Sequence, residues 1–398
     1  MSLRLARTAA PLILGTLAAC SFIPATAPTA PSSAPGVTAV PPGPGQAPGP
    51  GVPGALPPEV RLPGEPDHPH ARWVPIAFDE LPGWRGDRLV QGGWPALQRG
   101  CLAPPAAWRM LCAEALLEPP ADDAAARRWL EARLQAYRVE SVGGDATGLA
   151  TGYFEPLVEA RRRPQGAFRT PLWAPPADLA THRPWYTRQE IDDLPQAQAA
   201  LRGREIAWVA DPLDALVLQV QGSGRLHVVE PDGRDRVVRL AYAAHNDQPY
   251  RSIGRWLIDQ GELKPGEASW PAIKDWVKRN PRRLPELLSA NPRMVFFREE
   301  ALPDPAQGPR GAQGVPLTPG RSIAVDPAAV PYGGAVWLDT TEPLSARPLQ
   351  RLVMAQDTGS AITGAPRADF FWGWGDDAEA QAGRMKQPLR MWVLWPKG

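Results

Sequence analysis

A long stretch rich in proline, alanine, glycine and serine, from Phe22 to about His70, limits where this chain can fold. Such a segment has too little apolar side-chain area to form a core, so we expect an extended tether. The folded body should then run from about Arg72 to Lys397. Of the 398 residues, 43% are hydrophobic and 21% are charged, which is enough for a sizeable core in two medium domains.

The residues before the tether have the pattern of a secretory signal. Arg4 and Arg7 precede a short apolar run that ends in the tetrapeptide L-A-A-C at Leu17–Cys20. This tetrapeptide resembles the bacterial lipobox, in which the cysteine carries lipid; a plain signal peptide with an incidental cysteine is the alternative. We expect lipid on Cys20 and a membrane anchor rather than a membrane span. Ser21, in place of an aspartate, favours the periplasmic face of the outer membrane.

Charge and motif content exclude several classes of function. The 43 Lys and Arg residues nearly balance the 42 Asp and Glu residues, so no basic field indicates nucleic-acid binding. Neither H-E-x-x-H nor C-x-x-C occurs, and we expect neither a metal nor a cofactor. With Cys20 set aside, Cys101 and Cys112 form an even pair in an oxidising compartment, which favours a disulfide over two unpaired thiols.

Short apolar runs predict strands over much of the folded body, and helical spacing predicts several helices. The expected helices are Asp122–Tyr137, Ser252–Gln260, one capped by Ser269, and Arg282–Ser289. The expected strands are Ala150–Glu155, Glu205–Val209, Ala215–Gln221, Leu226–Val229, Met294–Phe297, Ser322–Val325, Ala335–Leu338, Arg351–Ala355 and Met391–Leu394. The fold class is therefore mostly β or α+β.

Three aspartates in the last hundred residues carry the strongest chemical signal. Asp326 lies in A-V-D-P, Asp357 in Q-D-T-G-S and Asp369 in R-A-D-F-F-W-G. Aspartate is depleted in strands, yet each of these closes or flanks an apolar run; a turn residue that bonds backbone amides is the alternative for each. The D-T-G-S segment also resembles the aspartic-protease signature, but that chemistry needs two carboxylates that share a proton. Bilobal members carry two such motifs and this chain has one; a homodimer could supply the second, but the subunits of homodimeric members are much shorter.

Several motifs in the same order connect the chain to a known family. They are T-G-Y-F-E-P from Thr151, V-Q-G-S-G from Val220, Y-R-S-I-G from Tyr250, N-P-x-x-V-F-F from Asn291, and the three aspartate segments. From about Leu81 to Trp395 the sequence resembles the membrane-bound lytic transglycosylase A (MltA) family, with its C-terminal three-aspartate, or 3D, domain. One departure is Ser360, where a second glycine is common in the family.

The resemblance implies a double-psi β-barrel that faces a second domain of strands and helices across a substrate groove. It implies a signal peptide over residues 1–19 and a lipidated cysteine with tether over 20–71. The barrel would take 72–154 plus 301–398, and the second domain 155–300. Members cleave peptidoglycan between N-acetylmuramic acid and N-acetylglucosamine without water and leave a 1,6-anhydro end.

The resemblance assigns catalysis to Asp369, acting first as acid and then as base. Asp357 and Asp326 would support it, with purely structural roles as the alternative. The residues that it implies in substrate contact are Tyr153, Gln221, Gly222, Ser223, Gly224, Tyr250 and Arg251. The partners that it implies are glycan strands of peptidoglycan and other cell-wall enzymes. A non-catalytic glycan-binding lipoprotein on the same barrel is the alternative function.

Overall fold

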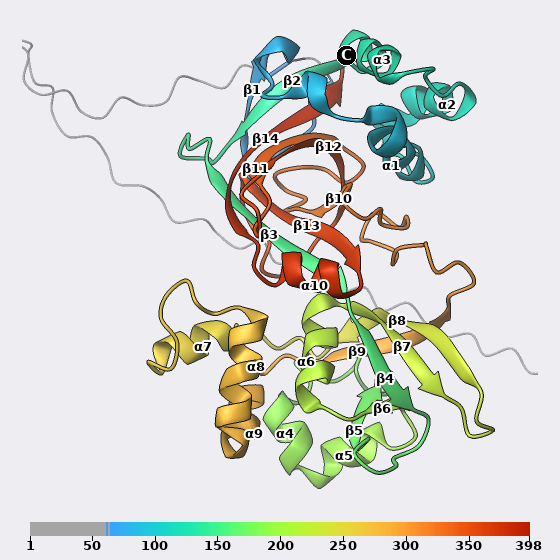
Figure 1. Ribbon diagram of the computed structural model, residues 1–398, viewed down its shortest axis with the longest axis vertical. Coiled ribbons are helices and arrows are strands. Elements are labelled where there is room, and N and C mark those ends of the chain that lie inside the picture. The colour runs from blue at the N-terminus through green and yellow to red at the C-terminus, as the bar shows by residue number, and fades with distance from the viewer. Residues whose placement is uncertain (1–60, 63) are drawn as a thin grey trace, which may run out of the picture. The chain divides into compact units, whose positions relative to one another are not determined.

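The computed structural model describes residues 61, 62 and 64–398 (Figure 1). The expected signal peptide, Cys20 and most of the tether lie outside the described residues. Within the described part, no helix is both long and apolar enough to cross a membrane.

Eight strands form the larger of two sheets, in the order β1-β2-β14-β11-β12-β10-β13-β3. Strand β14 also pairs with β3, so six of the strands, from β14 round to β3, close into a ring. This closed ring confirms the expected barrel in a mostly β, α+β fold. The strands are β1 (Arg72–Ile76), β2 (Leu134–Glu140), β3 (Gly148–Glu155), β10 (Ser322–Ala324), β11 (Ala335–Thr341), β12 (Pro348–Asp357), β13 (Arg367–Trp374) and β14 (Lys386–Pro396).

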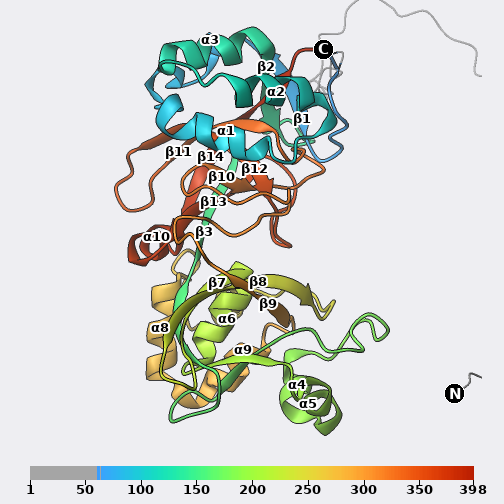
Figure 2. The ribbon, with the colours of Figure 1, turned by 90° about the vertical axis from the view of Figure 1, so that its right-hand side faces the viewer.

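The second sheet has six strands in the order β5-β6-β4-β7-β8-β9. The chain enters it directly from the barrel, because only Pro156 separates β3 from β4. The strands are β4 (Leu157–Arg161), β5 (Thr170–Trp173), β6 (Glu205–Val209), β7 (Ser223–Val229), β8 (Asp235–His245) and β9 (Val295–Ala301). Figure 2 shows this sheet with α6 lying against it.

Helices accompany both sheets (Figures 1 and 2). The α-helices are α1 (Trp94–Gly100), α2 (Arg109–Leu117), α3 (Asp123–Arg133), α4 (Arg188–Asp193), α5 (Pro195–Leu201), α6 (Pro212–Gln221), α7 (Ile253–Asp259), α8 (Trp270–Arg279), α9 (Leu284–Ser289) and α10 (Asp376–Ala382). Shorter helical turns are Phe78–Glu80, Trp84–Gly86, Leu89–Gly93, Ala106–Trp108 and Pro281–Arg283. A disulfide joins Cys101, just after α1, to Cys112 on α2.

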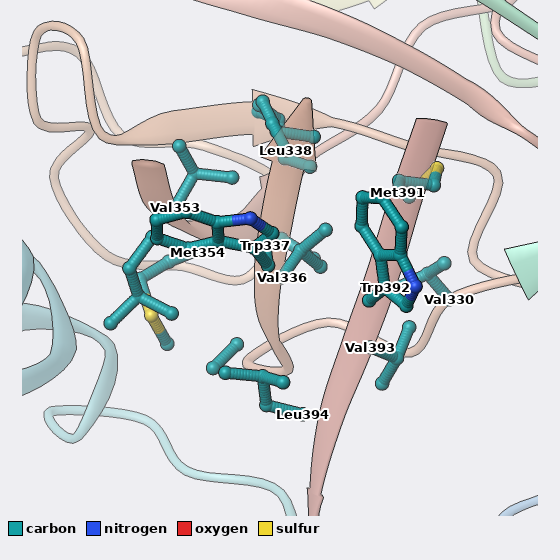
Figure 3. Packing of buried hydrophobic residues seen from close by; sticks show 14 of the residues in the cluster. Val330, Val336, Trp337, Leu338, Val353, Met354, Met391, Trp392, Val393 and Leu394 are labelled. Atoms are coloured by element: carbon teal, nitrogen blue, oxygen red, sulfur yellow. The ribbon is translucent and has the colours of Figure 1, made fainter. Parts of the chain in front are cut away.

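The barrel core is built from strands that are buried on both faces. Consecutive residues Val336, Trp337 and Leu338 of β11 are each at most 1% exposed, and Val393 and Leu394 of β14 are fully buried (Figure 3). Side chains alternate between the two faces of a strand, so both faces of β11 and β14 are covered. This explains why these strands read as continuous apolar runs in the sequence.

The segment Ala215–Gln221, predicted as a strand, lies in helix α6 instead. Five of the seven residues of the segment are buried, and a short apolar run of this kind does not distinguish a strand from a buried helix. The signal that identifies the helix lies just upstream. The Asp211 carboxylate accepts a hydrogen bond from the Leu213 N–H at 2.8 Å, and Pro212 occupies the first turn.

The predicted helix Asp122–Tyr137 is too long. Helix α3 ends at Arg133, and the following residues form strand β2, which pairs with β1 and β14. The buried residues Leu130, Leu134 and Tyr137 fit helical spacing. Leu134 and Tyr137 are nevertheless in a strand, because this part of the chain pairs with both β1 and β14. The cap at Asp122 is present, and its carboxylate accepts a hydrogen bond from the Ala125 N–H at 2.7 Å. The predicted cap Ser269 is also confirmed, and Ser252 caps α7 in the same way.

Candidate active site

A cavity of about 760 Å³ lies between residues of the barrel and residues of the second sheet. The barrel side includes Thr151, Tyr153, Asp357, Arg367 and Asp369. The opposite side includes Gln221, Gly222, Ser223, Tyr242, His245, Tyr250, Arg293 and Arg298. The cavity therefore contains two of the three predicted aspartates and most of the residues predicted to contact substrate.

Asp369 lies on β13, next to Thr151 of the parallel strand β3. The Thr151 hydroxyl donates a hydrogen bond to Asp369 Oδ1 at 2.6 Å. Arg367 Nη2 in turn donates to the Thr151 oxygen at 2.9 Å, so the guanidinium reaches the carboxyl through the threonine. Burial raises the pKa of Asp369, and it outweighs the hydrogen bond from Thr151 and the charge of Arg367, which both lower it.

Asp357 is the last residue of β12, and donors from two other segments of the chain hold its carboxyl. The Tyr153 hydroxyl donates to Oδ2 at 2.9 Å, and the Ala312 N–H donates to Oδ1 at 3.1 Å. Burial raises the pKa of Asp357 to about 6, although these two hydrogen bonds and one from the Thr358 backbone oppose the rise. Burial and the adjacent carboxylate also raise the pKa of Tyr153 well above 10, so its phenol stays a donor.

Asp326 lies outside the cavity lining and has a different environment. His70 Nδ1 lies 2.7 Å from its Oδ2, and the N–H groups of Gly364 and Ala328 donate to its carboxyl at 2.7 and 2.9 Å. Burial alone would raise its pKa, but these hydrogen bonds together bring the pKa below the ordinary value. Asp326 thus ties the segment before β13 to the rest of the barrel.

The Q-G-S-G segment begins at Gln221, the last residue of α6. The Gln221 side-chain oxygen accepts a hydrogen bond from the Phe154 N–H at 3.0 Å, which fixes the segment to β3. Gly222 ends the helix with φ = 78°, a conformation that glycine adopts at no steric cost. Together with Ser223, these residues line the cavity.

Two of the predicted contact residues lie outside the cavity lining. A Cβ added to Gly224 would lie 2.0 Å from Leu218 Cδ2, so this glycine serves close packing. Arg251 is exposed and does not line the cavity, whereas its neighbour Tyr250 does. The arginine that lines the cavity is Arg293, in the N-P-x-x-V-F-F segment.

Sequence reasoning missed several lining residues, among them Thr151, Tyr242, His245, Arg293 and Arg298. Thr151 and Arg293 lie within motifs that the sequence had already marked. The others lie on β8 and β9, where no motif signals them. In the described residues, no group of three His, Cys, Asp or Glu side chains is arranged to hold a metal ion.

A buried carboxylate supports the site where the chain passes from the barrel to the second sheet. Glu155, the last residue of β3, is fully buried and pairs with Arg225 and Arg239, both at 2.7 Å. Arg225 Nη1 also donates to the Pro305 carbonyl at 2.7 Å, on the segment that returns to the barrel, and its guanidinium lies 3.8 Å from the centre of the Trp374 ring. This cluster therefore links the two chain segments that connect the sheets: the one from β3 to β4 and the one that leads from β9 back to the barrel.

Two family models match the chain. The MltA specific insert domain matches residues 149–298, and the 3D domain matches residues 321–395. The chain is 34% identical over 262 residues to membrane-bound lytic murein transglycosylase A of Vibrio cholerae. The matched region covers 63% of this chain and 67% of the relative.

Solved structures agree with this relation. A lytic transglycosylase of Burkholderia pseudomallei, LtgG, is 47% identical with a TM-score of 0.57, over 82% of this chain and 96% of that one. Escherichia coli MltA with bound chitohexaose is 25% identical with a TM-score of 0.66, over 82% and 95% of the two chains. The motifs, the barrel and these matches show that the chain belongs to the family of membrane-bound lytic murein transglycosylase A.

Proposed function

We propose that this chain is a lytic transglycosylase that cleaves the bond between N-acetylmuramic acid and N-acetylglucosamine in peptidoglycan without water. Family membership supports peptidoglycan as the substrate, and the E. coli relative with bound chitohexaose supports a glycan in the cavity. The observation that carries the proposal is Asp369, a carboxyl on the cavity wall whose pKa burial raises.

The chemistry needs one proton carrier. Asp369, protonated at the start, donates its proton to the glycosidic oxygen as the bond from that oxygen to the anomeric carbon breaks. The resulting carboxylate accepts the proton of the 6-hydroxyl of the same muramic acid, whose oxygen forms the new bond to the anomeric carbon. The sugar ring already holds this hydroxyl close, so no protein nucleophile and no water is needed. A raised pKa is what the first step requires.

Asp357 and its partners position the site in this proposal. Tyr153 and the Ala312 N–H hold the Asp357 carboxyl, and its position at the end of β12 places it on the same cavity wall as Asp369. Gln221 and Ser223 are the proposed glycan contacts on the other wall. Asp326 remains structural, since it lies outside the lining.

The test is the Asp369→Asn variant on purified glycan strands, with products read by mass spectrometry. Wild-type protein should release 1,6-anhydro products, which are lighter by one water than hydrolytic products. The variant should lose at least about 10²-fold in rate, as expected for loss of general acid–base catalysis, while it stays folded and binds glycan. Hydrolytic products, or a loss smaller than about tenfold, would contradict the mechanism. Binding without any cleavage by the wild type would support the non-catalytic alternative.

Domain limits and membrane attachment complete the proposal. The pairing of β3 with barrel strands and of β4 with the second sheet supports a barrel of 72–154 plus 301–398 and a second domain of 155–300. The L-A-A-C pattern and the membrane-bound relative support lipid on Cys20, after removal of residues 1–19, and a place at the periplasmic face of the outer membrane. Lipid labelling followed by membrane fractionation tests this part.

A further inference from the structure

The two walls of the cavity differ in charge. The barrel wall carries the carboxyls of Asp357 and Asp369 together with the guanidinium groups of Arg310 and Arg367, so both signs of charge are present on it. Among the described residues of the second sheet and its helices, the cavity lining includes the cations Arg293 and Arg298 and the imidazole of His245, but no carboxylate. A neutral glycan does not call for a cationic wall, so this wall indicates a further, acidic part of the ligand.

Among the described residues, Arg293 is the cation on this wall that has no carboxylate counter-charge. In the described part of the chain no carboxylate pairs with it, whereas Arg298 pairs with Glu300 at 2.7 Å. Arg293 Nε donates to the Gln248 carbonyl at 2.8 Å, and its backbone N–H donates to the buried Asn291 side chain at 3.3 Å. The half-buried guanidinium is thus fixed in place, while its terminal nitrogens have no hydrogen-bond partner among the described residues.

Neutral donors accompany Arg293. The Asp247 N–H donates to His245 Nδ1 at 2.9 Å, so the neutral ring carries its proton on Nε2 and offers a donor there. Burial and the charge of Arg293 lower the pKa of His245, which keeps the ring neutral. The nearby Asp247 carboxylate lies 3.2 Å from His245 but pairs with Arg183 at 2.8 Å, so another cation balances its charge. The Tyr242 ring lies 6.3 Å from that of His245 and adds a hydroxyl.

We propose that Arg293, with His245 and Tyr242, binds a carboxylate of the peptide stem attached to the glycan. The inference rests on the proposed function, because the peptide stems of peptidoglycan are its acidic part. A fixed guanidinium beside neutral donors is the donor set that a carboxylate prefers. The enzyme therefore cleaves peptide-bearing strands in preference to the same strands with neutralised stem carboxyl groups.

The experiment compares kcat/KM on peptide-bearing glycan strands with kcat/KM on the same strands after their stem carboxyl groups have been converted to neutral methylamides. For the wild type we expect a preference of about tenfold, which corresponds to about 1.4 kcal/mol and weakens as salt screens the charge. Arg293→Gln should lose most of this ratio, and Arg293→Lys, which retains the charge, should keep part of it. The matched control is Arg282→Gln, which replaces an exposed arginine outside the cavity and should leave the ratio unchanged.

A wild-type enzyme that cleaves both substrates equally, or an Arg293→Gln variant that keeps the preference, would overturn the inference. A second readout separates this outcome from failure of the proposed function. Calorimetric titration of the whole chain carrying Asp369→Asn with peptide-bearing glycan fragments measures binding without cleavage. Adding Arg293→Gln should weaken this binding by about tenfold; unchanged binding overturns the inference, even if the wild type is active. Arg293-dependent binding by a protein that cleaves nothing would support the carboxylate site and refute only the proposed reaction.

Discussion

Replacing Asp357 with asparagine should make the protein more stable at neutral pH, in a way that depends on pH. Burial raises the pKa of the folded-state Asp357 from 3.8 to about 6. A carboxyl whose folded pKa lies above its unfolded value favours the folded state most at low pH, and that contribution is lost as pH rises through the folded pKa. The interval from 3.8 to about 6 corresponds to about 3 kcal/mol, at 1.36 kcal/mol for each pH unit.

Urea unfolding of the two proteins at intervals from about pH 4 to about pH 8 tests this value. Near pH 4 the two free energies of unfolding should be similar, and above about pH 7 the variant should be more stable by up to about 3 kcal/mol. Subtracting the wild-type free energy of unfolding from that of the variant at each pH removes the contribution of every other titrating group that the substitution leaves unchanged. Asp259→Asn, in an exposed pair with Arg255, is the control and should change stability by less than about 1 kcal/mol. Parallel curves for Asp357→Asn and wild type, or a variant less stable above about pH 7, would refute the reasoning.

Two further predictions follow from the contacts of strand β3. Glu155→Gln removes the carboxylate that pairs with the buried Arg225 and Arg239. The free energy of unfolding, measured in urea, should fall by about 3–5 kcal/mol, because two buried cations lose their counter-charge. A loss below about 1 kcal/mol would contradict the described cluster. Thr151→Val removes the hydrogen bond that lowers the pKa of Asp369. The rate, which requires the protonated acid, should therefore stay high to a more alkaline pH than in the wild type; an unchanged or more acidic limb in the pH–rate profile would contradict this.

Much of the fold could be predicted because local signals agree with tertiary structure. Glu205–Val209 is a strand with the predicted bounds, and the predicted serine cap begins α8. The errors arise where one apolar pattern fits two structures. Helix α6 is buried on nearly all sides, so its periodicity is hidden, and β2 carries helical spacing but pairs with two strands. Only tertiary contacts decide such segments.

The candidate site was predictable where chemistry coincides with a motif. Asp357 and Asp369 line the cavity, but Asp326, with the same sequence signal, does not. The sequence left open whether Arg367 contacts Asp369, because a guanidinium two residues away on a strand can point along several directions. In the structure it acts through Thr151. The sequence did not predict Arg293 as a binding residue. Its candidate role follows from the lack of a carboxylate partner among the described residues, which depends on the fold and not on the spacing of residues in the sequence.

The spacing within T-G-Y-F-E-P explains why one short motif affects the whole site. Thr151, Tyr153 and Glu155 are alternate residues of β3 and so project from one face of the strand. They contact, in order, Asp369, Asp357 and the arginines at the crossing to the second sheet.

The intervening Gly152 belongs to the other face of the strand. An added Cβ there would lie 2.7 Å from Trp372 Nε1 and 2.9 Å from Ala382 Cα, so the packing of β13 and α10 against β3 requires glycine. This packing fixes the register of β3, and a slip of one residue would turn all three alternate side chains to the wrong face. The geometry of both cavity carboxyls therefore depends on a glycine that has no polar group of its own to offer.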